Sequence, residues 1–274
     1  MRLRSAALCG AVLFALAVAS PAAVHGAPIA FAPVAVIGDF GSGSTDEQAV
    51  ADLVARSGAI AVVTTGDNVY DDSGYAHLVG DYYGRWVAGQ DLLPATGNHD
   101  YDEGIADFDR YFTYLGGKHV YAFGRGGMRF FVLDSTAMLA SPTAATRQAG
   151  WLKRSLAASK ARWKVVVLHH PPFSSSTVHG STPEFQWPFG KWGADLVLSG
   201  HDHDYERIVR SGTTYVVDGS GGKDLYPFAD PVRGSITRYD AGHGALFLTA
   251  TATALTGEFR AVDGRVVDRF TLNP

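Results

Sequence analysis

The sequence predicts a single-domain α/β fold on the strength of three observations. Short runs rich in Val and Ile alternate with segments of helical periodicity along the 274 residues. Three of these runs end in Gly and then Asp or Asn, as strands do at the functional edge of an α/β sheet. The 46% hydrophobic content is ordinary for a globular protein, and no repeat or linker divides residues 30–274. We therefore expect residues 30–274 to form one domain.

The chain begins with the pattern of a secretory signal peptide, which we place at residues 1–26. Arg2 and Arg4 form its positive region, residues 5–19 its apolar run, and residues 22–27 offer small side chains for cleavage. The apolar run is shorter than the roughly 20 residues that a membrane-spanning helix needs. We expect a secreted protein, extracellular or periplasmic, cut between residues 22 and 27 and without a membrane segment after that cut.

Cysteine usage and charge narrow the chemistry. Cys9 is the one cysteine of the sequence and lies within the predicted signal, so the mature chain would have to bind any metal through His, Asp, Asn or Tyr. Loss of Arg2 and Arg4 changes the formal charge from −4 to −6. This modest negative charge argues against nucleic acid as a partner. No pattern in the sequence indicates an oligomeric state.

The first half of the domain contains the three runs that end in Gly-Asp or Gly-Asn. The predicted strands and their turns are Phe31–Ile37 before Gly38-Asp39, Ile60–Thr65 before Gly66-Asp67, and Leu92–Thr96 before Gly97-Asn98. Ser44 and Glu47 have the spacing of a capping box, which predicts a helix that ends near Ser57. Another helix is predicted over Asp102–Tyr114.

The second half continues the alternation and then becomes β-rich. The predicted strands here are Val120–Phe123, Met128–Asp134, Lys164–Leu168, Leu196–Leu198, Thr214–Val217, Ala245–Thr251 and Val266–Leu272. A long helix is expected to open at Ser141-Pro142. His169 follows one strand, and His201 and His203 follow the next. Their alternation predicts that both imidazoles of this pair face one side of an extended segment or tight turn.

The side chains at five strand ends form a donor set for a metal. Carboxylates, an amide oxygen and imidazoles suit Fe, Mn or Zn, whereas a Ca²⁺ site would use oxygen ligands alone. A single Asp after a strand is more often a turn former or a helix cap. Five such positions in order, however, indicate a metal centre.

Five segments carry a resemblance to a known family. They are Gly38-Asp39-Phe40-Gly41, Gly66-Asp67-Asn68-Val69-Tyr70, Gly97-Asn98-His99-Asp100, Val166-Val167-Leu168-His169 and Gly200-His201-Asp202-His203. These segments resemble the ordered motifs of calcineurin-like metallophosphoesterases, and Tyr70 makes the chain similar to purple acid phosphatases of the small tartrate-resistant type. The resemblance runs from about Val34 to Tyr205. It implies a four-layer α/β/β/α sandwich with two central mixed sheets and the metals at the strand ends.

The resemblance also implies a dinuclear centre and its ligands. Asp39, Asp67, Tyr70 and His203 would bind Fe(III). Asp67 would bridge to a divalent Fe, Zn or Mn that Asn98, His169 and His201 complete. The metals and their anionic ligands would leave a net charge of roughly +2, which attracts a phosphate ester.

Further residues are expected around this centre. His99 matches the family's substrate-binding histidine. His179 lies in the loop of a second active-site histidine, at a spacing one residue longer than expected. His170, next to His169, is expected to support the ligands from outside or to be structural. Some neighbouring charged residues could orient the ligands or could equally be solvated surface groups: Asp100, Asp202, Asp204, Glu206 and Arg207.

The activity implied is that of a secreted acid phosphatase. It would hydrolyse small phosphomonoesters by direct attack of metal-bound hydroxide on phosphorus. A phosphodiesterase or nucleotidase could use the same centre, because the loops rather than the ligands select the ester. A non-enzymatic metal- or phosphate-binding protein on the same scaffold is the third interpretation of these motifs.

Overall fold

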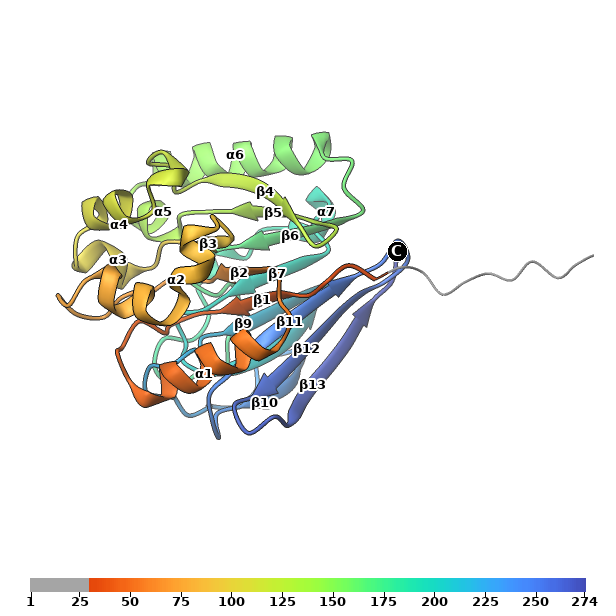
Figure 1. The fold of residues 1–274 in the computed structure, drawn as a ribbon. Coiled ribbons are helices and arrows are strands. Elements are labelled where there is room, and N and C mark those ends of the chain that lie inside the picture. Colours follow the sequence, from red (N-terminus) through yellow and green to blue (C-terminus); the bar gives the residue numbers. More distant parts are fainter. Residues whose placement is uncertain (1–29) are drawn as a thin grey trace, which may run out of the picture.

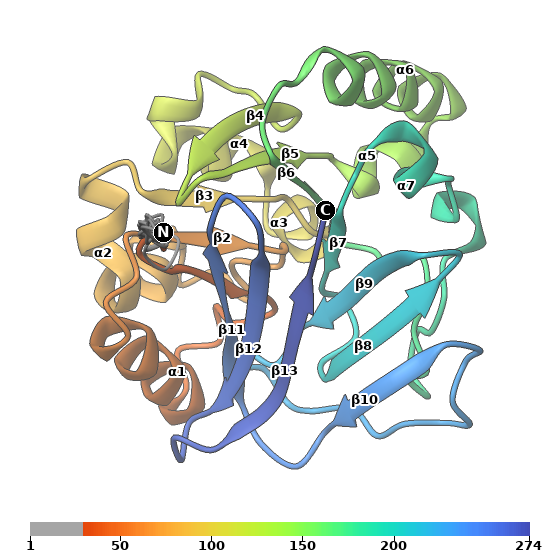
Figure 2. The same cartoon turned by 90° about the vertical axis from the view of Figure 1, so that its right-hand side faces the viewer.

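The computed structural model describes residues 30–274. The predicted signal peptide lies outside these residues. Two β-sheets pack face to face and helices cover the outer face of each (Figures 1 and 2). This is the α/β fold with two mixed sheets that the resemblance implied.

The first sheet has six strands in the spatial order β13-β12-β11-β1-β2-β3. Its strands are β1 (Val34–Ile37), β2 (Ala61–Thr64), β3 (Leu92–Pro94), β11 (Gly244–Ala250), β12 (Leu255–Ala261) and β13 (Val266–Leu272). The first three are parallel to one another, whereas β11 pairs antiparallel with β1. The parallel strands therefore place their carboxyl ends, and the residues that follow, at one edge of the sheet.

The second sheet has seven strands in the order β10-β8-β9-β7-β6-β5-β4. Its strands are β4 (Tyr121–Arg125), β5 (Met128–Val132), β6 (Trp163–Val167), β7 (Leu196–Ser199), β8 (Tyr205–Arg210), β9 (Thr213–Asp218) and β10 (Ser235–Tyr239). Strands β5, β6, β7 and β9 run parallel. The segments that follow β6 and β7 consequently meet those that follow β1 and β2.

The helices form the outer layers. They are α1 (Thr45–Arg56), η1 (Ala76–Gly80), α2 (Asp81–Ala88), α3 (Asn98–Asp102), α4 (Ile105–Tyr111), η2 (Thr113–Leu115), α5 (Ser135–Ala140), α6 (Pro142–Ala158), η3 (Pro183–Phe185) and α7 (Phe189–Trp192). In Figure 2, α1 and α2 lie beside the first sheet while α6 and α7 lie beside the second. The result is the expected four-layer arrangement.

Three apolar clusters hold the layers together. The central cluster joins the inner faces of both sheets, with Val36 and Val63 from one and Phe130 and Val167 from the other. A second cluster packs α1, α2 and α4 on the first sheet, and a third packs α5, α6 and α7 on the second. Burial of each large apolar side chain contributes about 1.5–3 kcal/mol, so the sheets form a rigid base for the loops at their edge.

The predicted helix over Asp102–Tyr114 is wrong as a single element. The chain forms α3 up to Asp102, breaks, and resumes as α4 from Ile105. Gly104 causes the break because its φ of 112° lies outside the helical range. The chain changes direction here, so α3 is a separate short helix that begins at Asn98, beside the other strand ends.

The capping box predicted for α1 is half right. The Ser44 hydroxyl caps the helix by accepting the amide of Glu47 at 3.1 Å. The Glu47 carboxylate does not return to Ser44 and instead accepts the amides of Ser42 and Gly43 at 3.0 and 2.8 Å. Glu47 thus fixes the loop that leads from the end of β1 into α1.

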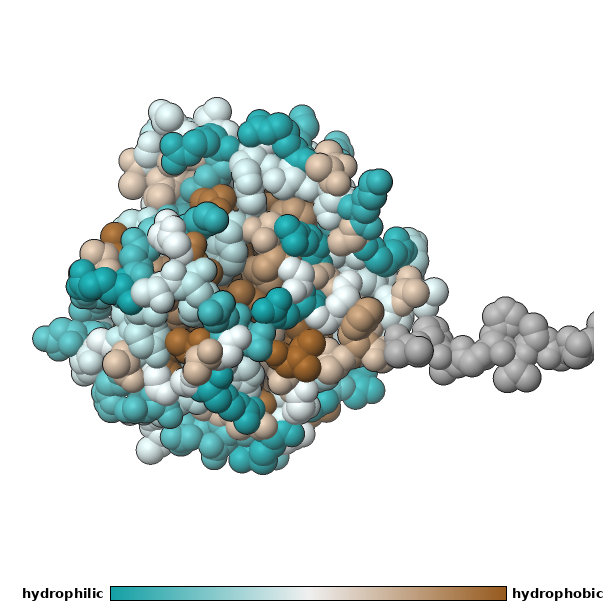
Figure 3. All heavy atoms as spheres, turned by 45° about the horizontal axis from the view of Figure 1, so that its top comes forward, coloured by the Kyte–Doolittle hydropathy of each residue, from teal (hydrophilic) through white to brown (hydrophobic). Residues whose placement is uncertain are grey.

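The molecular surface is mixed in character. On the face shown in Figure 3, hydrophobic residues form separate patches among hydrophilic ones. Within residues 30–274, none of the helices combines the length and the apolarity that crossing a bilayer demands.

Candidate metal centre

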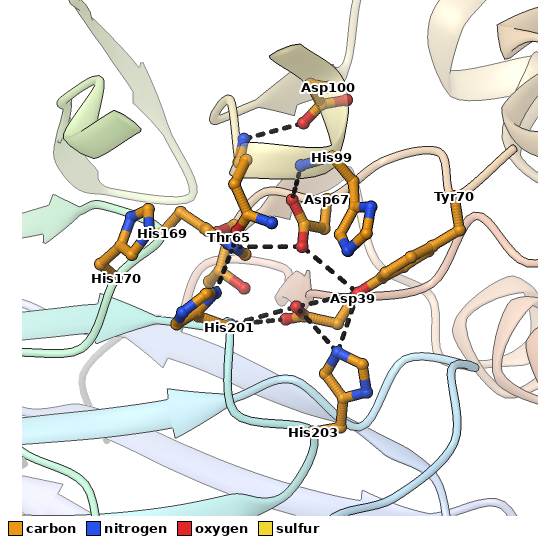
Figure 4. A network of polar contacts seen from close by, with 12 residues as sticks. Asp39, Thr65, Asp67, Tyr70, His99, Asp100, His169, His170, His201 and His203 are labelled. Atoms are coloured by element: carbon orange, nitrogen blue, oxygen red, sulfur yellow. Dashed lines mark hydrogen bonds and ion pairs between the residues drawn. The ribbon is translucent and has the colours of Figure 1, made fainter. Parts of the chain in front are cut away.

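The residues after β1, β2 and β7 reach the centre through unusual backbone conformations. Asp39, Asp67 and His201 have positive φ values of 57°, 50° and 71°. Such values are uncommon for residues other than glycine and cost about 1–3 kcal/mol each. The segment of His201 and His203 is therefore a bent loop rather than the extended option of the prediction, yet both rings point into the same site (Figure 4).

A first group of donor atoms surrounds the hydroxyl of Tyr70. This oxygen lies 2.9 Å from Nε2 of His203, 3.1 Å from Oδ1 of Asp39 and 3.4 Å from Oδ2 of Asp67. The four residues come from three different strand ends and a loop. They are the same four that the resemblance assigned to the first metal.

A second group surrounds Nε2 of His169. This nitrogen lies 3.0 Å from Oδ1 of Asn98, 3.1 Å from Nδ1 of His201 and 3.2 Å from Oδ2 of Asp67. The donor atoms of Asp67, His169 and His201 all fall within 4.8 Å of one another. Because Oδ2 of Asp67 belongs to both groups, the arrangement suits two cations that share one carboxylate (Figure 4).

Two of the imidazoles are held by backbone carbonyls. Nδ1 of His169 donates to the carbonyl of Thr65 at 3.0 Å, and Nδ1 of His203 donates to that of Asp224 at 2.7 Å. These contacts fix the tautomer and turn each Nε2 towards the site. Such outer contacts are the usual partners of metal-binding histidines.

Electrostatics favour cations at this place. Asp39 and Asp67 are both buried. Burial raises the pKa of Asp39 well above its usual range, and burial together with Asp39 and Asp67 raises the pKa of Tyr70. Burial lowers the pKa of His201 far below its usual range and that of His203 to about 4. Neutral imidazoles beside crowded buried oxygen donors are the chemistry that transition-metal ions complete.

Asp67 and His169 form the tightest electrostatic pair of the site. Although burial opposes the effect, Asp67 raises the pKa of His169 to about 9. The carboxylate of Asp67 also accepts the amide of His99 at 2.9 Å. A metal that binds Nε2 of His169 must therefore displace a proton.

Two glycines make room for these donors. A Cβ on Gly97 would collide with the carboxylate and the backbone nitrogen of Asp67, and one on Gly66 would lie 2.6 Å from Nδ1 of His169. Gly66 also has a φ of 105°. The glycines that precede Asp67 and Asn98 are thus steric requirements as well as turn signals.

His99 and His179 lie at the rim. The ring of His99 is 4.4 Å from that of Tyr70, centroid to centroid. His179 is exposed and stacks on His201 at 3.9 Å. His99 thus lies against the first donor group and His179 against the second, so the structure brings together all nine site residues that the sequence singled out.

The neighbouring polar residues are not solvated surface charges. Asp100, Asp202, Asp204 and Glu206 are fully buried, and His170 nearly so. Asp100 accepts the amide of Gly97 at 2.8 Å and so shapes the Asn98 turn. Three further contacts support the surrounding loops. They are hydrogen bonds between His170 and Ser135 and between Glu206 and Ser175, and the ion pair of Arg207 with Asp268. Both carboxylate oxygens of Asp204 have no hydrogen-bond partner among the described residues.

Two residues near the centre are not predicted by the sequence patterns. The ring of Tyr226 lies parallel to that of His203 at 4.0 Å, and Nζ of Lys223 lies 5.1 Å from the centroid of the Tyr70 ring. The one local signal is the Gly219-Ser220-Gly221-Gly222 run just before them, which by itself indicates only a turn. No spacing rule connects this run with Tyr70.

Comparisons with known proteins agree with the geometry. The family model described as calcineurin-like phosphoesterase matches residues 32–205. Among curated relatives, purple acid phosphatase 15 of Arabidopsis thaliana is 31% identical over 52% of this chain, and purple acid phosphatase 17 is 27% identical over 72%. The matches span 32% and 70% of those two proteins, so the chain covers about a third of the first.

Solved structures show the same fold. GAP50, the anchor in the inner membrane complex of Plasmodium, has a TM-score of 0.74 at 18% identity, with 89% of each chain covered. The yellow lupin purple acid phosphatase PPD1 has a TM-score of 0.69 at 22% identity, over 90% of this chain and 54% of that one. Since the family model covers more than half of the sequence, the chain belongs to the calcineurin-like phosphoesterase family of hydrolases, with distant similarity to plant purple acid phosphatases.

Proposed function

We propose that this protein is a secreted acid phosphatase that hydrolyses phosphomonoesters at a dinuclear metal centre. One observation carries the proposal: two groups of four donor residues share a single oxygen, Oδ2 of Asp67. Such sharing would place two cations side by side. Phosphoester substrates are typical of the family to which the chain belongs.

The ligand assignment follows the two groups. Asp39, Asp67, Tyr70 and His203 would hold Fe(III), and Asp67, Asn98, His169 and His201 would hold divalent Fe, Zn or Mn. The buried phenol supports the trivalent ion, because a phenolate forms at low pH only beside a strongly acidic cation. When bound, the two ions would acidify water and neutralise the phosphoryl oxygens.

The chain's own side chains would orient the ester and deliver protons. The backbone amide of His99 donates a hydrogen bond to Oδ1 of Asp67, and the ring of His99 lies against that of Tyr70. His179 stacks on the ring of His201, at the second donor group. We assign His99 to a hydrogen bond with a phosphoryl oxygen and His179 to the leaving-group oxygen, which takes up a proton when the ester bond breaks.

The decisive experiment measures metal content and hydrolysis together. Purified protein should contain about two metal ions per chain. It should also cleave p-nitrophenyl phosphate faster than bis(p-nitrophenyl) phosphate, with an optimum below pH 7. Asp67→Ala should lose both metals and nearly all turnover, whereas Asp52→Ala on the exposed face of α1 should keep both. Faster cleavage of the diester would instead assign a phosphodiesterase. A fully metallated protein without turnover would assign a binding protein.

Secretion is tested separately. N-terminal sequencing of the protein exported by its native host should find the chain starting between residues 23 and 28. An intact Met1 on exported or cell-retained protein would contradict the proposed signal peptide.

A further inference from the structure

Lys223 places a positive charge beside the centre. Its ammonium lies over the ring of Tyr70, 5.1 Å from the centroid, on the same ring that His99 flanks. Among the Lys and Arg residues of the described chain, it is the one that lies over the ring of a proposed metal ligand. The side chain is half-buried, so its position is restricted while its head group can still meet a ligand.

The backbone of Lys223 is fixed to the metal centre. Its amide donates to the carbonyl of Asp39 at 3.0 Å. The carbonyl of the next residue, Asp224, accepts the Nδ1 proton of His203 at 2.7 Å. The carbonyl of Lys223 accepts Nε2 of His243 at 3.1 Å. Lys223 therefore belongs to a segment that is hydrogen-bonded to two proposed ligands of the first metal, Asp39 and His203.

Gly222, directly before Lys223, allows the segment to take this path. Gly222 has a φ of 153°, and a side chain there would lie 2.7 Å from Cα of Glu47. The carbonyl of Gly222 accepts the hydroxyls of Ser42 and Ser44, both at 3.0 Å. The loop after β1 and the Lys223 segment thus form one unit, and the ammonium is positioned in advance of substrate.

The ammonium is not neutralised by a neighbour. None of the ion pairs found within residues 30–274 involves Lys223. The carboxylate of Asp71 lies near enough for Lys223 to contribute to a lowered pKa of that group, but the Ser73 hydrogen bonds dominate that pKa and Asp71 is exposed. The charge of Lys223 is consequently free to meet a ligand.

We propose that Lys223 binds a second anionic group of the substrate. The substrate class is then a phosphomonoester that carries a carboxylate or another phosphate a few bonds from the ester, such as the phosphate of a hydroxy acid. The donor groups around Asp67 account for the phosphoryl group alone. With both metals bound, the net charge of roughly +2 at the centre is balanced by a dianionic phosphoryl group, so a second anion next to it would need a further cation. This inference rests on the proposed phosphatase function.

The test uses two phosphonates that cannot be hydrolysed. Phosphonoacetate carries a second anionic group and methylphosphonate does not. Calorimetric titration of the metal-loaded protein should give roughly tenfold tighter binding of phosphonoacetate. In Lys223→Gln this ratio should fall to about two, whereas Lys223→Arg should keep most of it. Lys153→Gln, on the exposed side of α6, is the matched control and should leave the ratio unchanged.

Turnover provides the second measurement. The ratio of kcat/KM for 2-phosphoglycolate to that for ethyl phosphate should fall about fivefold in Lys223→Gln, through KM rather than kcat. Thermal unfolding and metal content show whether the variant is intact. An unchanged ratio in an intact Lys223→Gln protein overturns the inference, and a ratio near one in the wild type does so too. If wild-type protein binds no metal or neither phosphonate, the proposed function itself has failed.

Discussion

The carboxylate of Asp202 accepts the backbone amide of Gly180 at 3.1 Å, and also that of His179 at 3.2 Å. This contact joins the loop of one rim histidine to the segment that carries His201 and His203. The loop is otherwise exposed at its tip, so Asp202 sets where the ring of His179 lies.

Asp202→Ala should therefore reduce activity by displacing His179. Loss of an acceptor for two amides removes hydrogen bonds worth about 1.5–3 kcal/mol of stability at a charged group, so the loop of His179 is no longer held. Displacement of a proton-donating side chain should then lower kcat/KM by roughly tenfold or more. His179→Ala should cause a similar decrease. The measurement is a double-mutant cycle: the two changes together should cost little more than one alone. Fully additive losses would show that Asp202 acts through another route.

Tyr70→Phe removes the phenol and keeps the ring that packs on His99. The variant should lose the visible absorption band of an iron–tyrosinate pair, and its iron content should decrease. Absorption spectra and metal analysis of wild type and variant check this. A colourless wild-type protein that is fully active with Zn or Mn alone would exclude the Fe(III) assignment.

Gly97→Ala should disrupt the metal centre and also destabilise the protein, because the new Cβ collides with the backbone nitrogen of Asp67. The new methyl group meets the carboxylate of Asp67. Because Asp67 serves both donor groups, metal content should fall for both ions. Gly84→Ala in α2 is the matched control, because its methyl group would find no atom within 4 Å. That change should stabilise the protein by up to about 1 kcal/mol without affecting metals. Metal analysis and urea unfolding report the two effects.

Glu47 predicts a pH dependence of stability that is independent of the ligands. Burial raises its pKa to about 8, against the opposing amides of Gly43 and Ser42. The folded state thus holds the proton more tightly than the unfolded state. The stability that this group contributes is complete below about pH 4.5 and is lost as the pH rises through 8.

Glu47→Gln should remove this loss. Between pH 5 and pH 9 the variant should lose less unfolding free energy than the wild type, by an amount of order 1 kcal/mol per pH unit within the window. Urea unfolding at both pH values, at equal metal content, checks the sign. Parallel pH profiles for the two proteins would contradict the burial of a titrating Glu47.

Much of the fold was predictable because local chemistry and final position coincide. Strands β1, β2, β6 and β7 are buried apolar runs followed closely by Gly or His, and α6 opens at a Ser-Pro cap that the structure retains. Strand β8 was not predicted because its sequence is rich in charge. Glu206 and Arg207 are instead satisfied by Ser175 and Asp268, which are distant in sequence.

The residues of the metal centre likewise fall into those that the sequence could predict and those that it could not. Residues that directly follow a strand could be predicted, because the sheet fixes where strand ends meet. Lys223 and Tyr226 could not, since they reach Tyr70 and His203 through a loop whose path depends on contacts with Ser42, Ser44 and Asp39. Nothing local to residues 219–226 encodes that path.

The left-handed backbone at Asp39, Asp67 and His201 has a consequence for how such a protein changes over generations. Each of these residues is held in a conformation that glycine or asparagine would adopt at lower cost. As long as the centre is under selection, that cost is retained. In a descendant that no longer needs the metal centre, substitution of these positions would raise the free energy of unfolding. Loss of the metal-donor residues would then accompany a higher unfolding temperature rather than a lower one.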